Sequence, residues 1–202
     1  MGVTLQRLLD HAADGGRLTA EEALELYTDA PFHALGRAAD AARRRRFADT
    51  AGIATYLIDR NINYTNVCLT ACKFCAFYRA PKHAEGWTHS VDEIVRRADE
   101  AVDLGATQVM LQGGHSPELG IEWYEGMLRA VKASQPELAV HSFGASEVVH
   151  IARTSDLSYA DVIARLKAAG LDSFAGAGAE ILPARPRTVI APLKESGETW
   201  LE

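Results

Sequence analysis

The spacing of apolar residues divides the chain into a helical beginning and a longer region where strands and helices alternate. Over residues 1–50 the apolar positions recur at the spacing of one helix face. Thr19 and Glu22 have the spacing of a capping box that opens a second helix. Pro31 suits the first turn of a third helix. We therefore expect residues 1–50 to form an N-terminal helical segment.

From residue 51 onward, short apolar runs alternate with longer amphipathic ones. The runs typical of strands are, in chain order, Ile53–Ile58 with a continuation over Ile62–Tyr64, then Thr107–Leu111, Leu138–Phe143 and Leu171–Phe174. The helices between them are expected from Ser90, in a capping box with Glu93, to Gly105, over Ile121–Ala133, and from Ser158 to Gly170. This alternation predicts about four parallel strands in sequential order, with helices over one face.

The predicted fold class is therefore α/β: a partial TIM-like (β/α) barrel over residues 51–202, preceded by the helical segment. In barrels of this kind, the chemistry lies at the carboxyl ends of the strands. Residues that follow the predicted strands are for this reason the first candidates for a functional site.

Composition excludes some classes of function. The 202 residues are 48% hydrophobic and 24% charged, as in an ordinary globular protein. A net charge of −6 offers no broad basic face for a phosphate backbone, so no nucleic-acid partner is expected. No apolar stretch has the length of a membrane span, and charged residues follow soon after the first residue. We expect no membrane association and a cytoplasmic location.

The chain has three cysteines, Cys68, Cys72 and Cys75, and they carry the main chemical signal. An odd, clustered set is a poor disulfide framework. In this CxxxCxxC spacing, three thiolates can hold a 4Fe-4S cluster and leave one iron open. That iron can chelate S-adenosylmethionine (SAM), and electron transfer into the sulfonium then releases a deoxyadenosyl radical. The alternatives are a zinc site completed by His83 or His89, or buried thiols that bind nothing.

Four residues near the cysteines or after the next strand are candidates for cofactor contacts. Phe74, just before the last cysteine, is expected to pack against the cluster and limit solvent. Gln112, Gly113 and Gly114 end the second long strand in a turn, and the glycines would let the backbone approach the methionine end of the cofactor. A glycine pair alone is more often only a tight turn.

Three further residues after strand ends are candidate catalytic groups. His115 follows the glycine pair, and Glu147 and Glu180 follow the third and fourth predicted strands. Either carboxylate could hydrogen-bond ribose hydroxyls or manage a proton. The alternative for each is a solvated loop carboxylate.

The residues around these positions resemble a known family. Asn61–Arg79, which contains the cysteines, resembles the radical SAM enzymes of the futalosine route to menaquinone and their deazaflavin-synthase relatives. Leu111–His115 and Ile121–Glu125 look most like cyclic dehypoxanthinyl futalosine synthase, and Ala169–Ser173 and Gly178–Leu182 point the same way. The resemblance runs from about Gly16 to Glu202 and implies a barrel of the radical SAM type.

The resemblance also implies a reaction, cofactors and partners. The chain would be a radical SAM oxidoreductase or cyclase of menaquinone biosynthesis, with a 4Fe-4S cluster and SAM as cofactors. A deoxyadenosyl radical would abstract a ribose hydrogen from dehypoxanthinyl futalosine, and the substrate radical would close onto its aromatic ring. Cys68, Cys72 and Cys75 would hold the cluster, and Gly113 and Gly114 would lie against the cofactor. An electron donor such as flavodoxin or ferredoxin is the expected protein partner.

The length sets the alternatives. The family's barrel has about six βα units, and we count four strands here, so the chain looks like the N-terminal half. A truncated or split form would expose sheet edges and apolar surface, and a second polypeptide could supply the rest of the barrel. The activity of the isolated chain is therefore left open. Other readings are the sister aminofutalosine synthase, a deazaflavin synthase relative, or a non-catalytic cluster-binding remnant.

Overall fold

The computed structural model describes residues 3–50 and 52–202, and the chain divides into two compact units, Met1–Tyr56 and Leu57–Glu202. Ala51, which stands at the boundary expected from the sequence, lies outside the described residues. Within the described ranges, no helix combines the length and the apolar character that crossing a bilayer requires.

The first unit contains the three helices expected there. They are α1 (Val3–Ala13), α2 (Ala20–Asp29) and α3 (Phe32–Arg46), followed by the short 3-10 helix η1 (Ala48–Thr50). The capping box before α2 is present, because Glu22 N donates to Thr19 Oγ1 at 3.2 Å and Thr19 N donates to Glu22 Oε2 at 2.8 Å. Leu9, Leu26 and two alanines of α3 form a small core.

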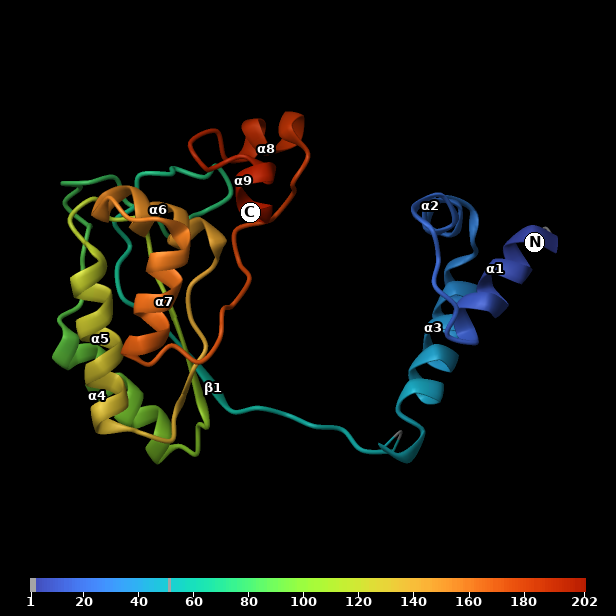
Figure 1. Ribbon diagram of the computed structural model, residues 1–202, viewed down its shortest axis with the longest axis horizontal. Coiled ribbons are helices and arrows are strands. Elements are labelled where there is room, and N and C mark those ends of the chain that lie inside the picture. The colour runs from blue at the N-terminus through green and yellow to red at the C-terminus, as the bar shows by residue number, and fades with distance from the viewer. Residues whose placement is uncertain (1–2, 51) are drawn as a thin grey trace. The chain divides into compact units, whose positions relative to one another are not determined.

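The second unit is a parallel sheet with helices along one face (Figure 1). Its strands are β1 (Asp59–Asn63), β2 (Gln108–Gln112) and β3 (Ala139–Val140), in the predicted order β1-β2-β3. The helices are α4 (Val91–Asp103), α5 (Ile121–Ser134), α6 (Ala145–Ser155), α7 (Tyr159–Ala169), α8 (Ala184–Ile190) and α9 (Gly197–Leu201). The two short helices α8 and α9 lie at the end of the sheet that carries the cysteine loop (Figure 1).

The core of this unit fills the space between the sheet and α4, α5 and α7. Ile62 of β1 lies opposite Leu111 of β2, Val109 lies opposite Val140 of β3, and these side chains are buried. The helices contribute Ile94, Leu128 and Leu166 among others. This layer fixes the carboxyl ends of the strands, which is where the predicted functional residues begin.

Two strand predictions are wrong in part. Ile53–Ile58 has no partner strand, and Ile53 and Tyr56 are 61% and 87% exposed, so only the expected continuation, from Asp59, pairs. An apolar run becomes a strand only where a neighbouring strand and a covering layer are available. The fourth expected strand is reduced to a short parallel pairing after Gly170: His141 and Ser173 form a bridge, and Ser142 N donates to Ser173 O at 2.9 Å.

The side chain of Asp172 explains why the pairing after Gly170 is so short. Val140 N donates to the Asp172 carboxylate at 2.8 Å, so this side chain takes the place of a main-chain carbonyl. The Ser90 prediction holds in part for a similar reason. Ser90 caps α4 by accepting from Glu93 N, but the Glu93 carboxylate binds Arg96 and Arg97 and does not close the capping box.

Candidate functional site

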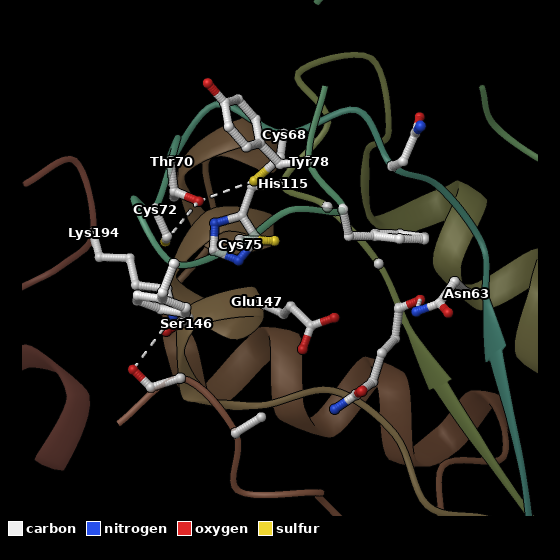
Figure 2. Close-up of a pocket in the computed structure, with 18 of the residues that line it drawn as sticks. Asn63, Cys68, Thr70, Cys72, Cys75, Tyr78, His115, Ser146, Glu147 and Lys194 are labelled. Atoms are coloured by element: carbon white, nitrogen blue, oxygen red, sulfur yellow. Dashed lines mark hydrogen bonds between the residues drawn. The ribbon is translucent and has the colours of Figure 1, made fainter. Parts of the chain in front are cut away.

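A cavity of about 270 Å³ lies at the carboxyl ends of the strands (Figure 2). Its lining includes every site residue expected from the sequence: Cys68, Cys72, Phe74, Cys75, Gln112, Gly113, Gly114, His115, Glu147 and Glu180. Thr70, Ser146 and Lys194 also line it, and sequence reasoning did not single them out. The cavity therefore gathers residues from five separate stretches of the chain at the end of the fold where α/β barrels carry their chemistry.

The cysteine loop is irregular but anchored at several points. Cys68 N donates to Arg79 O at 2.9 Å, and Cys75 N donates to Cys72 O at 3.0 Å. Lys73 N donates to Ile190 O at 2.8 Å, which ties the loop to the end of α8. Phe74 lines the cavity but is 52% exposed, so its expected packing against a cluster stays a prediction.

The three thiols face this common space without forming a disulfide. Thr70 Oγ1 lies 2.9 Å from Cys68 Sγ and 3.7 Å from Cys72 Sγ, so one hydroxyl serves both sulfurs. Burial raises the pKa of the Cys72 thiol, while the Thr70 hydrogen bond and the Lys194 ammonium act against that rise.

The thiols suit a cluster better than a single ion. A tetrahedral zinc would hold its sulfur ligands about 3.8 Å apart. Among the described His, Cys, Asp and Glu side chains, no group of three is placed to hold one metal ion. His83 and His89 do not line the cavity; His83 Nδ1 accepts from Glu85 N, and His89 packs on Trp87. Three sulfur donors spread around a cavity match the ligand set of a 4Fe-4S cluster with one open iron.

The glycine turn after β2 is required by close packing between two chain segments. Tyr64 N donates to Gln112 O at 3.0 Å, and Gly114 N donates to Thr65 O at 2.9 Å. A Cβ at Gly113 would lie 2.2 Å from the Tyr64 ring, and one at Gly114 would lie 2.2 Å from Val67 O. The absence of side chains thus lets the segment after β1 lie against the turn, whose other side faces the cavity.

Glu147 is a buried carboxyl group on the cavity wall. It lies in the first turn of α6, where Gly144 N donates to its Oε2 at 2.7 Å, and Tyr64 Oη donates to its Oε1 at 2.7 Å. Burial raises the pKa of Glu147 to about 7, although the bonds from Tyr64 and Gly144 act in the opposite direction. A carboxyl group with this pKa can gain or lose a proton near neutral pH.

His115 is buried beside a second imidazole. Its ring stacks on His150 with the centroids 5.0 Å apart, and His150 Nε2 donates to Ser116 O at 2.8 Å. Burial, and next the neighbouring His150, lower the pKa of His115 to about 3. His115 is therefore neutral at physiological pH and can offer a hydrogen bond but not a positive charge.

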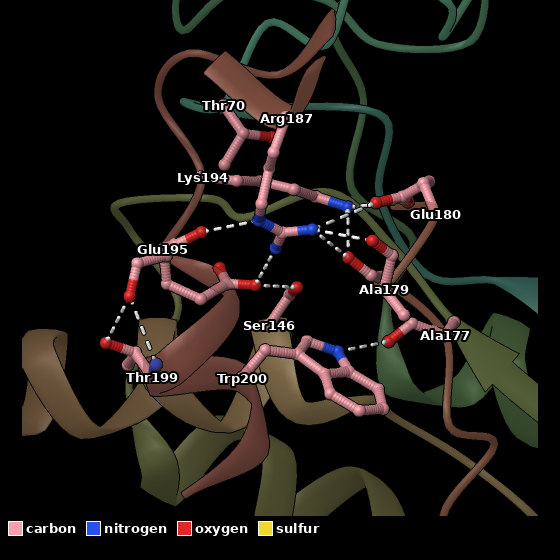
Figure 3. Close-up of polar contacts among 12 residues, drawn as sticks. Thr70, Ser146, Ala177, Ala179, Glu180, Arg187, Lys194, Glu195, Thr199 and Trp200 are labelled. Carbon is pink, nitrogen blue, oxygen red and sulfur yellow. Dashed lines mark hydrogen bonds and ion pairs between the residues drawn. The ribbon is translucent and has the colours of Figure 1, made fainter. Parts of the chain in front are cut away.

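Glu180 belongs to a charged network and is not the solvated or free carboxylate considered from the sequence (Figure 3). Lys194 Nζ lies 2.8 Å from Glu180 Oε1, and Arg187 Nη1 lies 3.7 Å from Glu180 Oε2. Arg187 Nη2 forms a buried ion pair with Glu195 Oε1 at 2.7 Å, and Ser146 Oγ donates to the same oxygen at 2.6 Å.

Arg187 also fixes the turn that carries Glu180. Its Nη1 donates to the carbonyl oxygens of Gly178, Ala179 and Ile181 at 2.6–3.3 Å. These contacts come from a C-terminal stretch in which proline and charge interrupt any periodic pattern. These contacts were not predictable from the sequence, because no local pattern shows that a charged side chain in this stretch is buried.

Comparisons with known proteins agree with this geometry. Residues 62–182 match the family model described as the Radical SAM superfamily. Over 199 residues the chain is 65% identical to the cyclic dehypoxanthine futalosine synthase of Streptomyces coelicolor, covering 98% of this chain and 50% of that protein. It is 39% identical to the protein of the same name from Halalkalibacterium halodurans, covering 98% and 53%. The chain thus spans about half the length of these curated relatives.

A solved structure supports the fold. The FeFe-hydrogenase maturase HydG from Carboxydothermus hydrogenoformans superposes with a TM-score of 0.54 at 16% identity, covering 84% of this chain and 47% of that one. At this identity the likeness concerns the fold alone. The architecture predicted from the sequence, a partial barrel, is confirmed.

Proposed function

The chain belongs to the radical SAM superfamily, and from this premise we propose that it forms the cofactor-binding half of an enzyme that makes cyclic dehypoxanthinyl futalosine from dehypoxanthinyl futalosine in menaquinone biosynthesis. The observation that carries the proposal is the cavity lined by Cys68, Cys72 and Cys75 together with the Gly113–Gly114 turn. When bound, a 4Fe-4S cluster and SAM would supply a deoxyadenosyl radical that abstracts a ribose hydrogen.

In this proposal the residues that line the cavity have different roles. The three cysteines hold the cluster, with the Thr70 hydroxyl beside two of the sulfurs. Phe74, Gln112 and the glycine turn face the cofactor, because they line the same space next to the thiols.

Glu147 is the proposed proton acceptor. Closure of a radical onto an aromatic ring, followed by recovery of aromaticity, releases one proton and one electron. The electron would return to the cluster, which reductive cleavage of SAM would leave oxidised by one electron. A carboxyl with a pKa of about 7 on the cavity wall can take that proton. His115, neutral at this pH, and Glu180 are the proposed hydrogen-bond partners of ribose hydroxyls.

We further propose two protein partners. A low-potential electron carrier such as flavodoxin or ferredoxin would reduce the cluster in the cytoplasm, where thiols stay reduced. A polypeptide segment carrying the remaining βα units would complete the substrate half, in keeping with the half-length match to the relatives.

Metal analysis tests the cofactor assignment. Anaerobically reconstituted protein is expected to hold about four irons per chain. Cys72→Ala should abolish the cluster's visible absorption, whereas Thr154→Ala, which keeps all three thiols, should leave it intact. Stoichiometric zinc without iron in protein isolated under anaerobic conditions would contradict the assignment.

An anaerobic assay with dehypoxanthinyl futalosine tests the reaction. Deoxyadenosine and cyclic product are followed separately, because an incompletely enclosed radical reacts with other hydrogen donors. We expect slow deoxyadenosine release without coupled product from this chain alone, and coupled product after the remaining barrel segment is added. Efficient coupled turnover by the 202-residue chain would contradict the half-site proposal, and formation of a different product would favour a sister enzyme.

A further inference from the structure

Few charged side chains line the cavity, and they differ in sign and in whether they are paired. Among the described residues that line it, Lys194 is the one lysine or arginine, and its side chain is 9% exposed. His115 adds no charge, because burial lowers its pKa to about 3. Glu180 pairs with Lys194 at 2.8 Å, and Arg187 and Glu195, which do not line the cavity, neutralise each other behind it.

Lys194 also lies on the side of the cavity where the thiols gather. Figure 2 shows its side chain reaching toward Cys72 and Ser146. Lys194, Glu180 and the three thiols all line this one cavity, and Lys194 pairs with Glu180 at 2.8 Å. The ammonium and the carboxylate therefore face the same space as the sulfurs and carry charges of opposite sign.

We propose that Lys194 sets the reduction potential of the cluster, with Glu180 as its counterweight. This inference rests on the proposed function, since it requires that Cys68, Cys72 and Cys75 hold a cluster. The cluster takes one electron from a low-potential donor and becomes more negative by one charge, while no bond forms or breaks. A nearby buried ammonium stabilises the added charge and makes reduction easier, and a carboxylate opposes it.

The ion pair between Lys194 and Glu180 holds both charges in fixed positions. Lys194 Nζ is held by Glu180 Oε1 and by Gly178 O at 3.5 Å, so its charge has a fixed place. The turn that presents Gly178 and Glu180 is itself fixed by Arg187 (Figure 3). Because the Lys194 side chain is only 9% exposed, its fixed charge acts more strongly on its neighbours than that of a surface lysine would.

The experiment is a potentiometric titration of the anaerobically reconstituted full chain, read from the electron paramagnetic resonance signal of the reduced cluster. In Lys194→Met, the equilibrium constant for one-electron reduction should fall at least tenfold, which is about 59 mV. Lys194→Arg, which keeps the charge, should stay within threefold of the wild type. Glu180→Gln should raise the constant, and Lys167→Met, on the exposed side of α7, should not change it.

The opposite signs separate an electrostatic role from a structural one. A general loosening of the site would move Lys194→Met and Glu180→Gln in the same direction, and that result, or no shift in either, would overturn the inference. If Lys194→Met binds no iron, the Glu180→Gln variant alone tests the proposal. An unchanged or lowered equilibrium constant for reduction in that variant contradicts it. A wild-type chain that takes up no cluster would instead refute the proposed function itself, and metal analysis reports that separately.

Discussion

Two parts of the cavity lining each carry a carboxyl group that follows a strand end: the buried wall around Glu147 and the charged wall around Glu180. Different interactions hold the two groups. In the buried wall, Glu147 receives hydrogen bonds from Tyr64 and Gly144, and burial raises its pKa despite the charge of Lys194. In the charged wall, Glu180 is paired with Lys194 and approached by Arg187. The comparison teaches that position after a strand does not fix the role of a carboxyl group. Its partners do, because burial raises the pKa of Glu147 although hydrogen bonds and the charge of Lys194 oppose the rise.

The two walls also rest on different supports. Tyr64, which holds Glu147, packs against the rings of Trp123, Tyr124 and Phe143, with centroids 5.6–6.3 Å away. In the charged wall, the turn is held through main-chain carbonyls, by Arg187 at Gly178, Ala179 and Ile181, and by Trp200 Nε1, which donates to Ala177 O at 3.2 Å. We therefore expect the stability of the buried wall to change with side-chain volume and with the protonation of Glu147. The stability of the charged wall should change when one charged side chain is removed.

The largest expected effect is on the charged wall. Arg187→Met would leave Glu195 buried without its partner, and both side chains are only 3% exposed. Removing one member of a buried ion pair costs about 3–5 kcal/mol. Urea unfolding under anaerobic conditions measures the loss. The matched variant is Arg129→Met, because Arg129 is 59% exposed and its partner Glu125 keeps Arg165, so the loss should be less than about 1 kcal/mol. Equal losses in the two variants would show that the network does not support the wall.

The second prediction concerns protonation in the buried wall. The pKa of Glu147 is raised from 4.5 to about 7, so its neutral form is favoured in the folded state. The stability that this form contributes is fully present below pH 4.5 and is lost as the pH rises through about 7. Glu147→Gln keeps the acceptor and donor capacity but cannot ionise. Between about pH 5 and pH 8 it should therefore gain about 3 kcal/mol over the wild type.

Urea titrations at a series of pH values measure this gap. Glu122→Gln, at a carboxylate whose side chain is 77% exposed, is the matched control and should follow the wild type at every pH. A Glu147→Gln curve that runs parallel to the wild type would mean that Glu147 does not carry its proton into the neutral range. Such a result would remove the main difference between the two walls.

The cysteine loop and the buried wall were largely predictable from the sequence, because their residues belong to local patterns. Cys68, Cys72 and Cys75 form a spaced motif, and the glycine pair and Glu147 each follow a strand that is recognisable from its apolar run. What the sequence did not show is the contact between Tyr64 and Glu147, which are far apart in the chain. The strand that positions Tyr64 was also displaced, because Ile53–Ile58 found no partner.

The charged wall was hardly predictable. Lys194, Arg187 and Glu195 lie in a stretch without periodicity, and a charged residue there is usually solvated. Burial reverses that expectation only when the cation and the carboxylate meet in three dimensions. Glu180 was found from its place after a strand-like run, but its pairing with Lys194 depends on the fold of the last twenty residues.

The smallest expected effect tests how tightly the buried wall is packed. In Gly113→Ala, the added Cβ would lie 2.2 Å from the Tyr64 ring, which is fixed by its aromatic neighbours and by Glu147. Inserting a methyl group into a packed site of this kind costs about 1–3 kcal/mol, measured by urea unfolding. Gly126→Ala in α5 has open space around the new Cβ and should gain about 0.5–1 kcal/mol, because alanine favours a helix interior.

A contrasting glycine, Gly176, precedes the charged wall in the chain. Gly176 has a φ of +68° and nothing within 4 Å of a built Cβ, so alanine there is opposed by the backbone alone. We expect Gly176→Ala to cost about 1–2 kcal/mol, and Gly176→Asn to recover part of it because asparagine tolerates the left-handed region. No asparagine should relieve Gly113, where the obstacle is the Tyr64 ring. If asparagine restored stability at both positions, the two walls would not differ in packing as described. Tyr64 would then have to move away from residue 113 and lose its hydrogen bond to Glu147.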